Sequence, residues 1–294
     1  MNLREALTKI GECCRSRTVA FYVAAGVSHD PPSCLPLGGE LAKAVSSGVL
    51  DCISPEEGAG LQQAIVDLSL EETCGIVQTA LDVPTGLVNA MADALDHDRL
   101  LPNSNHLFMA AALRQGHVVV TTNYDRQIER AYKLLYSSAL PVSQICYDDA
   151  TFNSLRHDML GSSTRGTGWL LKLHGSFRIS DRATGLKDVS SSVMTTLQRV
   201  GKGLPLSAER TLRGVLESCP LVVLGYGGMD IDIVYPLMMS IGSSQPIWWV
   251  MHGTEEEVHS SSELEGETTG EAVSYTHLRA HETVLDLVCR LLLE

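Results

Sequence analysis

The chain has 294 residues, and 44% of them are apolar, which is enough for a sizeable core in one large domain. The formal net charge of −13, with no run of Lys and Arg, argues against a nucleic acid as partner. No apolar stretch approaches the roughly 20 residues that a membrane helix needs. The first ten residues have the pattern of an amphipathic helix rather than that of a signal peptide. We therefore expect a cytoplasmic protein without a membrane partner.

The eight cysteines are scattered along the chain, and no two of them form a C-x-x-C pair. Structural zinc sites usually draw on such pairs, so the sequence predicts no zinc. Free thiols in a reducing compartment are favoured over disulfides.

The first part of the chain predicts a helix, a buried strand and a tight loop. Apolar residues recur on one helical face from residue 3 to residue 14, and residues 18–23 (T-V-A-F-Y-V) have the composition of a buried strand. The strand leads into A-A-G-V-S, residues 24–28, whose small side chains allow a backbone or a phosphate to approach closely. A proline-containing loop follows, and residues 39–49 then have helical spacing.

Residues 51–100 carry no strong strand signal but repeat apolar residues at helical spacing. We predict that a small helical module is inserted here, between the first strand and the second. The segment P-N-S-N-H, residues 102–106, opens another helix, with Ser104 or Asn105 as its N-cap.

An unbroken run of valines at residues 118–120 predicts a strand that is buried on both faces, and it stops at T-T-N-Y-D, residues 121–125. Helical spacing then begins at Tyr124 and continues with Ile128, Ala131 and Leu134. In an open parallel sheet, ligands bind at the carboxyl ends of the strands. Asn123 and Asp125 are therefore the first candidates for a functional site.

Strands alternate with helices through the rest of the chain. Further strands are predicted at residues 169–173, 221–224 and 247–250, and further helices near 193–200, 208–216 and 231–241. This alternation predicts an α/β fold, with a Rossmann-like parallel sheet, helices on both of its faces and the small inserted helical module.

The sequence divides into three parts. Residues 1–252 are expected to form the folded domain, and residues 253–272 an acidic, flexible segment. Residues 273–294 resemble the conceptual translation of a sequencing adapter that contaminates metagenomic assemblies. We expect this tail to be non-native and the natural protein to continue beyond about residue 272.

Four strand ends carry unusual polar or glycine content. Each has an ordinary explanation by itself, because a histidine after a strand is often structural, a glycine loop is often a turn, and Asn or Asp often caps a helix. Four such ends at one edge of a sheet favour a binding site. They are A-A-G-V-S at 24–28, T-T-N-Y-D at 121–125, H-G-S at 174–176 and G-Y-G-G-M-D at 225–230.

In this order the motifs resemble those of the sirtuin-like family of NAD-consuming enzymes. The family pattern is a G-A-G-x-S loop, a P-x-x-x-H segment, T-[TQ]-N-x-D, K-x-H-G and a late G-[YTS]-[GS] loop. The chain has a counterpart of each between about residues 15 and 250, with K-L-H-G at residues 172–175 as the fourth. One departure is Ala24, where the family has Gly and where a methyl group would clash if the backbone needed a positive φ. We expect this variant to be tolerated.

The variant T-T-N-Y-D-R-x-I-E, with L-P-L near the first loop and G-Y-G-G-x-D late in the chain, is similar to the prokaryotic antiphage-defence branch that includes the Thoeris effector. The deacylases of the family carry two C-x-x-C zinc pairs after the catalytic histidine, and this chain has none. The resemblance implies an NAD glycohydrolase that gives nicotinamide and ADP-ribose, with NAD as substrate and no zinc. It also implies an assembly of identical chains and an unknown activating partner or sensing domain.

By the same resemblance, Asn123 positions the ribose and the attacking water, Asp125 binds the nicotinamide carboxamide, and His174 accepts a proton from a ribose hydroxyl or from water. Backbone amides of the first loop would cradle the pyrophosphate, and the late glycines would let the adenosine side approach. The residues expected to bind NAD are Ala24, Ala25, Gly26, Val27, Ser28, Thr122, Gly225, Tyr226, Gly227 and Asp230.

Several alternatives stay open. Asp230 could bind a ribose or cap a helix, and His106 could contact the site or lock the loop before it. The chain as a whole could sense NAD or ADP-ribose without consuming it, a reading that Ala24 favours, or it could be a protein deacylase. An α/β domain whose polar strand ends are only caps is the simplest alternative.

Overall fold

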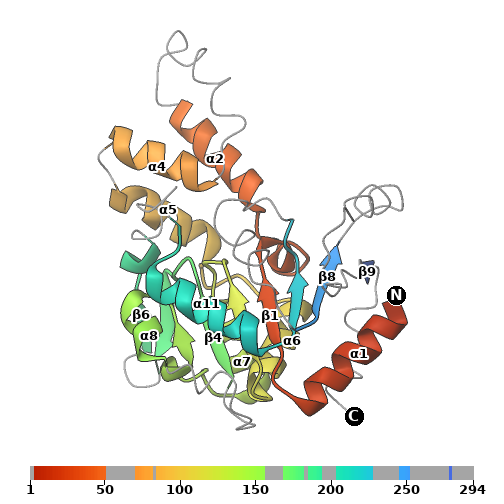
Figure 1. Cartoon of the computed structure of the whole chain (residues 1–294). Coiled ribbons are helices and arrows are strands. Elements are labelled where there is room, and N and C mark those ends of the chain that lie inside the picture. The colour runs from red at the N-terminus through yellow and green to blue at the C-terminus, as the bar shows by residue number, and fades with distance from the viewer. Residues whose placement is uncertain are drawn as a thin grey trace.

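The computed structural model describes residues 3–50, 70–81, 84–155, 168–181, 185–193, 203–227, 245–251 and 278–279. Its centre is a seven-stranded sheet in the order β3-β4-β2-β1-β7-β8-β9, in which every neighbouring pair is parallel (Figure 1). This confirms the predicted α/β class. The strands are β1 Ala20–Val23, β2 Val118–Thr121, β3 Ile145–Cys146, β4 Trp169–Lys172, β7 Leu221–Leu224, β8 Ile247–Met251 and β9 Leu278–Arg279.

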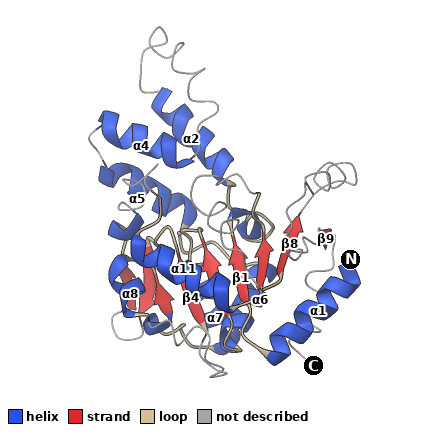
Figure 2. Ribbon diagram, viewed as in Figure 1, coloured by secondary structure: helices blue, strands red, loops and turns tan. Residues whose placement is uncertain are grey.

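Helices cover both faces of the sheet, as Figure 2 shows. One face packs against α1 (Leu3–Ser16), α6 (Ser104–Arg114) and α7 (Gln127–Tyr136). The other face packs against α8 (Asp149–Ser154) and α11 (Leu206–Ser218).

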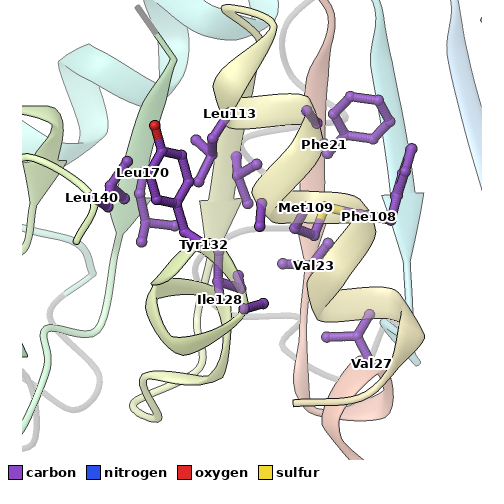
Figure 3. Close-up of a cluster of buried hydrophobic side chains, with 14 of the residues drawn as sticks. Phe21, Val23, Val27, Phe108, Met109, Leu113, Ile128, Tyr132, Leu140 and Leu170 are labelled. Atoms are coloured by element: carbon purple, nitrogen blue, oxygen red, sulfur yellow. The ribbon is translucent and has the colours of Figure 1, made fainter. Parts of the chain in front are cut away.

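The strands bury alternate side chains in two separate cores. Phe21 and Val23 of β1 join the first core, part of which is drawn in Figure 3, while Ala20 and Tyr22 join the second. This alternation follows from the strand period of two residues. It explains why the valines of β2 are unbroken, since both of their faces meet a layer of helices.

A third hydrophobic cluster lies beyond the carboxyl ends of the strands (Figure 1). It is built by α2 (Gly38–Leu50), α4 (Leu70–Leu81) and α5 (Pro84–Leu95), together with Tyr124 and Phe177 from the loops that follow β2 and β4. Helical structure is thus present within residues 51–100, although residues 51–69 lie outside the described part. Through Tyr124 and Phe177, this layer of helices contacts the sheet edge where the candidate residues emerge.

Three local predictions were wrong. The N-cap of α6 is Asn103, not Ser104 or Asn105, because the Asn103 side chain accepts the His106 N–H in a capping box. On α7, Ile128 and Ala131 are buried as predicted, but Leu134 is 67% exposed, and the third buried apolar residue is Tyr132. The helix also begins at Gln127 rather than Tyr124, because the Asp125 side chain accepts the Gln127 N–H just before the first turn.

Some elements have no counterpart among the predictions. They are β3, α8, the short helical turn η2 (Val142–Gln144) and the antiparallel hairpin of β5 (Arg178–Asp181) and β6 (Gly185–Asp188). The predicted helices at 193–200 and 231–241 lie almost wholly outside the described residues, as does the acidic segment 253–272. Of the predicted tail 273–294, only β9 is described. In the described ranges, no helix is both long and apolar enough to cross a bilayer.

Candidate functional site

The four strand ends identified in the sequence meet at one edge of the sheet. In register, Val23 at the end of β1 pairs with Thr121 of β2 and with Leu224 of β7, and Thr121 pairs with Lys172 of β4. Because all four strands are parallel, the residues that follow each of them leave the sheet side by side. The edge is therefore the carboxyl edge that the sequence predicted.

The loop after β1 forms the short helical turn η1 (Ala25–Ser28). Ala24 precedes it in an extended conformation, with φ −126° and ψ −170°, so its methyl group meets no backbone strain. Asn103 and Asn105 both donate to the Val27 carbonyl, at 2.8 and 3.3 Å. The start of α6 thus fixes the position of this loop.

The first glycine loop touches the loop after β7, backbone to backbone. The Gly26 N–H donates to the Gly225 carbonyl at 3.0 Å. Gly225 has φ +61°, and a Cβ there would lie 2.5 Å from the Val27 nitrogen, while a Cβ on Gly26 would lie 2.7 Å from the Gly225 oxygen. Only glycine fits both positions. The glycines therefore serve a contact between two loops, and the Gly26 amide is already bonded within the protein.

Tyr226, which follows Gly225, packs in the second core. The Tyr226 ring stacks on Trp249 at 5.6 Å between centroids and meets Tyr22 edge to face at 5.2 Å. Gly227 is exposed. Asp230 lies outside the described residues.

The hydroxyl of Ser28 is the centre of a cluster of polar side chains, which we call the Ser28 cluster: Ser28, His106, Asn123 and Asp125. Ser28 Oγ lies 3.0 Å from His106 Nε2, 3.1 Å from Asn123 Nδ2 and 3.1 Å from Asp125 Oδ2. Asn123 Nδ2 also donates to the Ala24 carbonyl at 3.2 Å. Residues from η1, from α6 and from the loop after β2, up to 97 positions apart, thus share one hydrogen-bond network.

Thr122 and His174 follow β2 and β4 at the same carboxyl edge of the sheet. Thr122 is buried directly after β2, and the Thr121 hydroxyl accepts the Asn123 N–H at 3.0 Å. His174 is buried after β4, with its ring 6.0 Å from that of Tyr124, and Tyr124 in turn packs on Phe177 at 5.6 Å. Tyr124 therefore lies between His174 and the layer of helices.

A layer of buried charges adjoins the cluster at Asp125, and it was not predicted from the sequence. Lys172, only 1% exposed, donates to the Asp125 carbonyl at 2.6 Å, to Ser176 Oγ at 2.9 Å and to Glu129 at 3.3 Å. Burial raises the pKa of Glu129, and the Lys172 ammonium opposes that shift. One side chain thus ties the loop that carries Asp125 to the loop that carries His174.

A second ion pair extends this layer toward the helices beyond the sheet edge. Both carboxylate oxygens of Asp96, which follows α5, lie 2.7 Å from Arg126 Nε. Burial raises the pKa of Asp96, while the hydrogen bond and the charge of Arg126 lower it. We call Asp96, Arg126, Glu129 and Lys172 the charged layer. In the sequence, Arg126 and Glu129 stand in the T-T-N-Y-D-R-x-I-E motif and Lys172 in K-L-H-G, but neither motif indicated that these charges are paired and buried.

The six cysteines of the described part are free thiols. Within those same residues, no group of three or more His, Cys, Asp or Glu side chains is arranged to hold a metal ion.

Three sirtuin structures are similar to the chain at 16% sequence identity, and each comparison covers 99% of this chain and 97% of the other. One, described as the structural basis for sirtuin substrate affinity, has a TM-score of 0.41. Another is a Sir2 variant with a deacetylated p53 peptide and 3'-O-acetyl ADP-ribose, at 0.47, and a third is Sir2Tm bound to a propionylated peptide, at 0.43.

No curated protein sequence matches the chain. The model of one protein family, described as the SIR2-like domain, matches residues 117–269, which is more than half of the 294 residues. The matched segment contains T-T-N-Y-D, K-L-H-G and G-Y-G-G-M-D. The chain therefore belongs to the SIR2-like domain family.

Proposed function

We propose that the chain is an NAD glycohydrolase that cleaves NAD to nicotinamide and ADP-ribose, and that it acts as an effector in bacterial antiphage defence. The observation that carries the proposal is the Ser28 cluster, in which Asn123 and Asp125 are bonded to the A-A-G-V-S loop at the edge where His174 also emerges. Residues 1–252 would form the catalytic unit.

The chemistry requires an enzyme to hold the ribose while positive charge builds on it and neutral nicotinamide leaves. Asn123 suits the task of orienting a ribose hydroxyl or water. Its Nδ2 is committed to Ala24 and Ser28, while its Oδ1 accepts no hydrogen bond from the described residues. Asp125 would bind the carboxamide of the nicotinamide, and His174 would take up a proton, a role worth about 10²- to 10⁴-fold in rate.

NAD would approach along the loops after β1 and β7. The Gly26 amide is bonded to Gly225, so a pyrophosphate would either use other amides of η1 or replace the Gly225 carbonyl. The side chains along this loop are small, which suits close approach of a phosphate.

Following nicotinamide release from NAD by the purified chain tests the proposal directly. Asn123→Ala and His174→Ala should each lower turnover by at least about 100-fold, because each removes a group that acts on the reacting atoms. Asn153→Ala on the exposed face of α8 is the matched control and should leave turnover unchanged. No turnover in a natively assembled sample, or full turnover by Asn123→Ala, would overturn the proposal.

Two alternatives are less well supported. A module that binds NAD without consuming it was favoured by Ala24 alone, and the extended backbone of Ala24 removes that reason. Such a module would be stabilised against thermal unfolding by NAD but would release no nicotinamide. A protein deacylase of this family is disfavoured because the chain has no C-x-x-C pair. An acyl-peptide assay tests that alternative.

A further inference from the structure

The hydrogen positions around Ser28 can be assigned from its neighbours. A hydroxyl offers one proton and two lone pairs. The amide nitrogen of Asn123 must face Ser28, because the same Nδ2 also lies 3.2 Å from the Ala24 carbonyl, which can only accept. Asn123 therefore donates to Ser28 and fills its first lone pair.

The tautomer of His106 is fixed on the other side of its ring. The Asn103 N–H donates to His106 Nδ1 at 3.1 Å, as part of the capping box of α6. A proton on Nδ1 would point at the Asn103 N–H and repel it, because both groups would then be donors. Ser33 Oγ lies farther from Nδ1, at 3.4 Å, and its own proton is directed to the Leu101 carbonyl at 2.8 Å. Nδ1 is therefore the acceptor, and Nε2 carries the proton.

With its proton on Nε2, His106 fills the second lone pair of Ser28. The Ser28 proton then has one acceptor left, which is Asp125 Oδ2 at 3.1 Å. The other carboxylate oxygen, Oδ1, accepts the Gln127 N–H at 2.9 Å. The carboxylate is thus held from two sides, by the first turn of α7 and by Ser28.

We propose that His106 is a positioning residue: its Nε2–H holds the Ser28 hydroxyl in the rotamer that donates to Asp125, and so fixes the carboxylate that receives the nicotinamide carboxamide. The last clause rests on the proposed function, whereas the tautomer and the hydrogen-bond chain do not. Burial supports the neutral ring, since it lowers the pKa of His106 although the Asp125 carboxylate acts in the opposite direction.

Two substitutions separate this role from the helix cap. In His106→Asn, the side-chain oxygen can take the place of Nδ1 and keep the bond from Asn103, but the side chain is too short to reach Ser28. In His106→Gln, the amide nitrogen can take the place of Nε2 and donate to Ser28, but the bond from Asn103 is lost. A residue that only capped the helix would tolerate Asn better than Gln.

We expect His106→Asn to raise both the KM for NAD and the inhibition constant for nicotinamide roughly tenfold, which is the effect of losing one well-placed hydrogen bond. His106→Gln should keep both constants within about threefold of the wild type while lowering Tm more than His106→Asn does. A loss of folded protein would lower the apparent kcat and leave both constants unchanged. The reverse order of the two variants would overturn the proposal.

Ser28→Ala and His117→Asn provide the controls. If His106 acts through Ser28, the double variant Ser28→Ala/His106→Asn should be no worse than Ser28→Ala alone. His117 is also buried and accepts a backbone N–H on its Nδ1, from Val19 at 3.3 Å, but it lies at the opposite end of β2. His117→Asn should therefore leave both constants unchanged.

Nitrogen-15 NMR of histidine-labelled wild-type protein tests the inference without any turnover. The His106 signal, assigned by its loss in His106→Gln, should be that of a neutral ring with its proton on Nε2 at pH 7. A ring protonated on Nδ1 would overturn the proposal. A wild type with this tautomer but no turnover would sink the proposed function and leave the hydrogen-bond chain intact.

Discussion

The Ser28 cluster and the charged layer meet at Asp125, whose carboxylate belongs to the cluster and whose carbonyl accepts from Lys172, yet they are built from different interactions. The cluster contains one carboxylate, and its other groups are neutral donors and acceptors. The charged layer consists of ion pairs whose side chains are almost completely buried, at 1% exposed for Lys172 and 3% for Glu129. Asn123, by contrast, is only partly buried.

This difference decides which side chains can exchange their hydrogen-bond partners for a ligand and which cannot. A buried charge that loses its partner has no water to replace it, so within each ion pair, Asp96 with Arg126 and Glu129 with Lys172, each side chain depends on the other. The Ser28 cluster holds groups that a bound ligand could share or replace at a modest cost in free energy. Because Lys172 bonds both the Asp125 carbonyl and Ser176, we expect the charged layer to keep the loops that carry Asp125 and His174 in place when a ligand binds at the cluster.

The largest expected effect comes from breaking the charged layer. Lys172→Met should lower the free energy of unfolding by about 3–5 kcal/mol, because it leaves Glu129 as a buried charge without its partner. Ser28→Ala should cost only about 1 kcal/mol. Urea unfolding of both variants measures the difference.

The double variant Lys172→Met/Glu129→Gln is the control for charge. It removes the stranded carboxylate and should recover part of the lost stability. Equal losses for Lys172→Met and Ser28→Ala would remove the distinction between the two regions.

A smaller effect is expected where the two glycine loops meet. Gly225→Ala should cost about 2–4 kcal/mol, because alanine is strained at φ +61° and its Cβ would overlap the Val27 nitrogen. Gly185 has φ +81° but nothing within 4 Å of a built Cβ, so Gly185→Ala should cost only about 1 kcal/mol. Thermal unfolding compares the pair, and equal shifts in Tm would argue against a close contact at Gly225.

The smallest effect concerns pH and uses a histidine outside both regions. Burial lowers the pKa of His117 to about 4, below the ordinary value of 6.5. The unfolded chain therefore binds the proton first as the pH falls, so this histidine stabilises the fold above about pH 6.5 and loses that contribution toward pH 4. Between pH 7 and pH 5 the loss should be about 2 kcal/mol.

His117→Asn should remove that part of the pH dependence. Because the comparison is the wild type minus the variant, contributions from Glu129 and Asp96 cancel. An unchanged slope between pH 7 and pH 5 would show that His117 is not held neutral by burial.

The sheet could be predicted from the sequence because its central strands are short, apolar and followed at once by polar or glycine residues. The run V-V-V-T-T-N-Y-D gave both the end of β2 and the site edge. By contrast, β3 has two residues, and the described side chains of β6 are all exposed, so neither leaves an apolar pattern. Leu134 shows the limit of helical spacing, since an apolar residue near the buried face can still point to solvent.

The contacts within the site could not be predicted in the same way. Ser28 and His106 are 78 positions apart, and Lys172 and Glu129 are 43 apart, so no local pattern joins them. A lysine in a strand is usually exposed, and the burial of Lys172 depends on carbonyls and a carboxylate supplied by another loop. Sequence motifs indicated which residues gather at the edge but not which hydrogen bonds they share.

The bond between the Gly26 N–H and the Gly225 carbonyl has a kinetic consequence. A ligand that uses this amide can bind only while the two loops are apart, so its apparent affinity is its intrinsic affinity multiplied by the fraction of time the loops spend open. Its association rate is then limited by loop opening and falls below the rate set by diffusion. Substitutions that loosen the contact would speed association at the expense of fold stability.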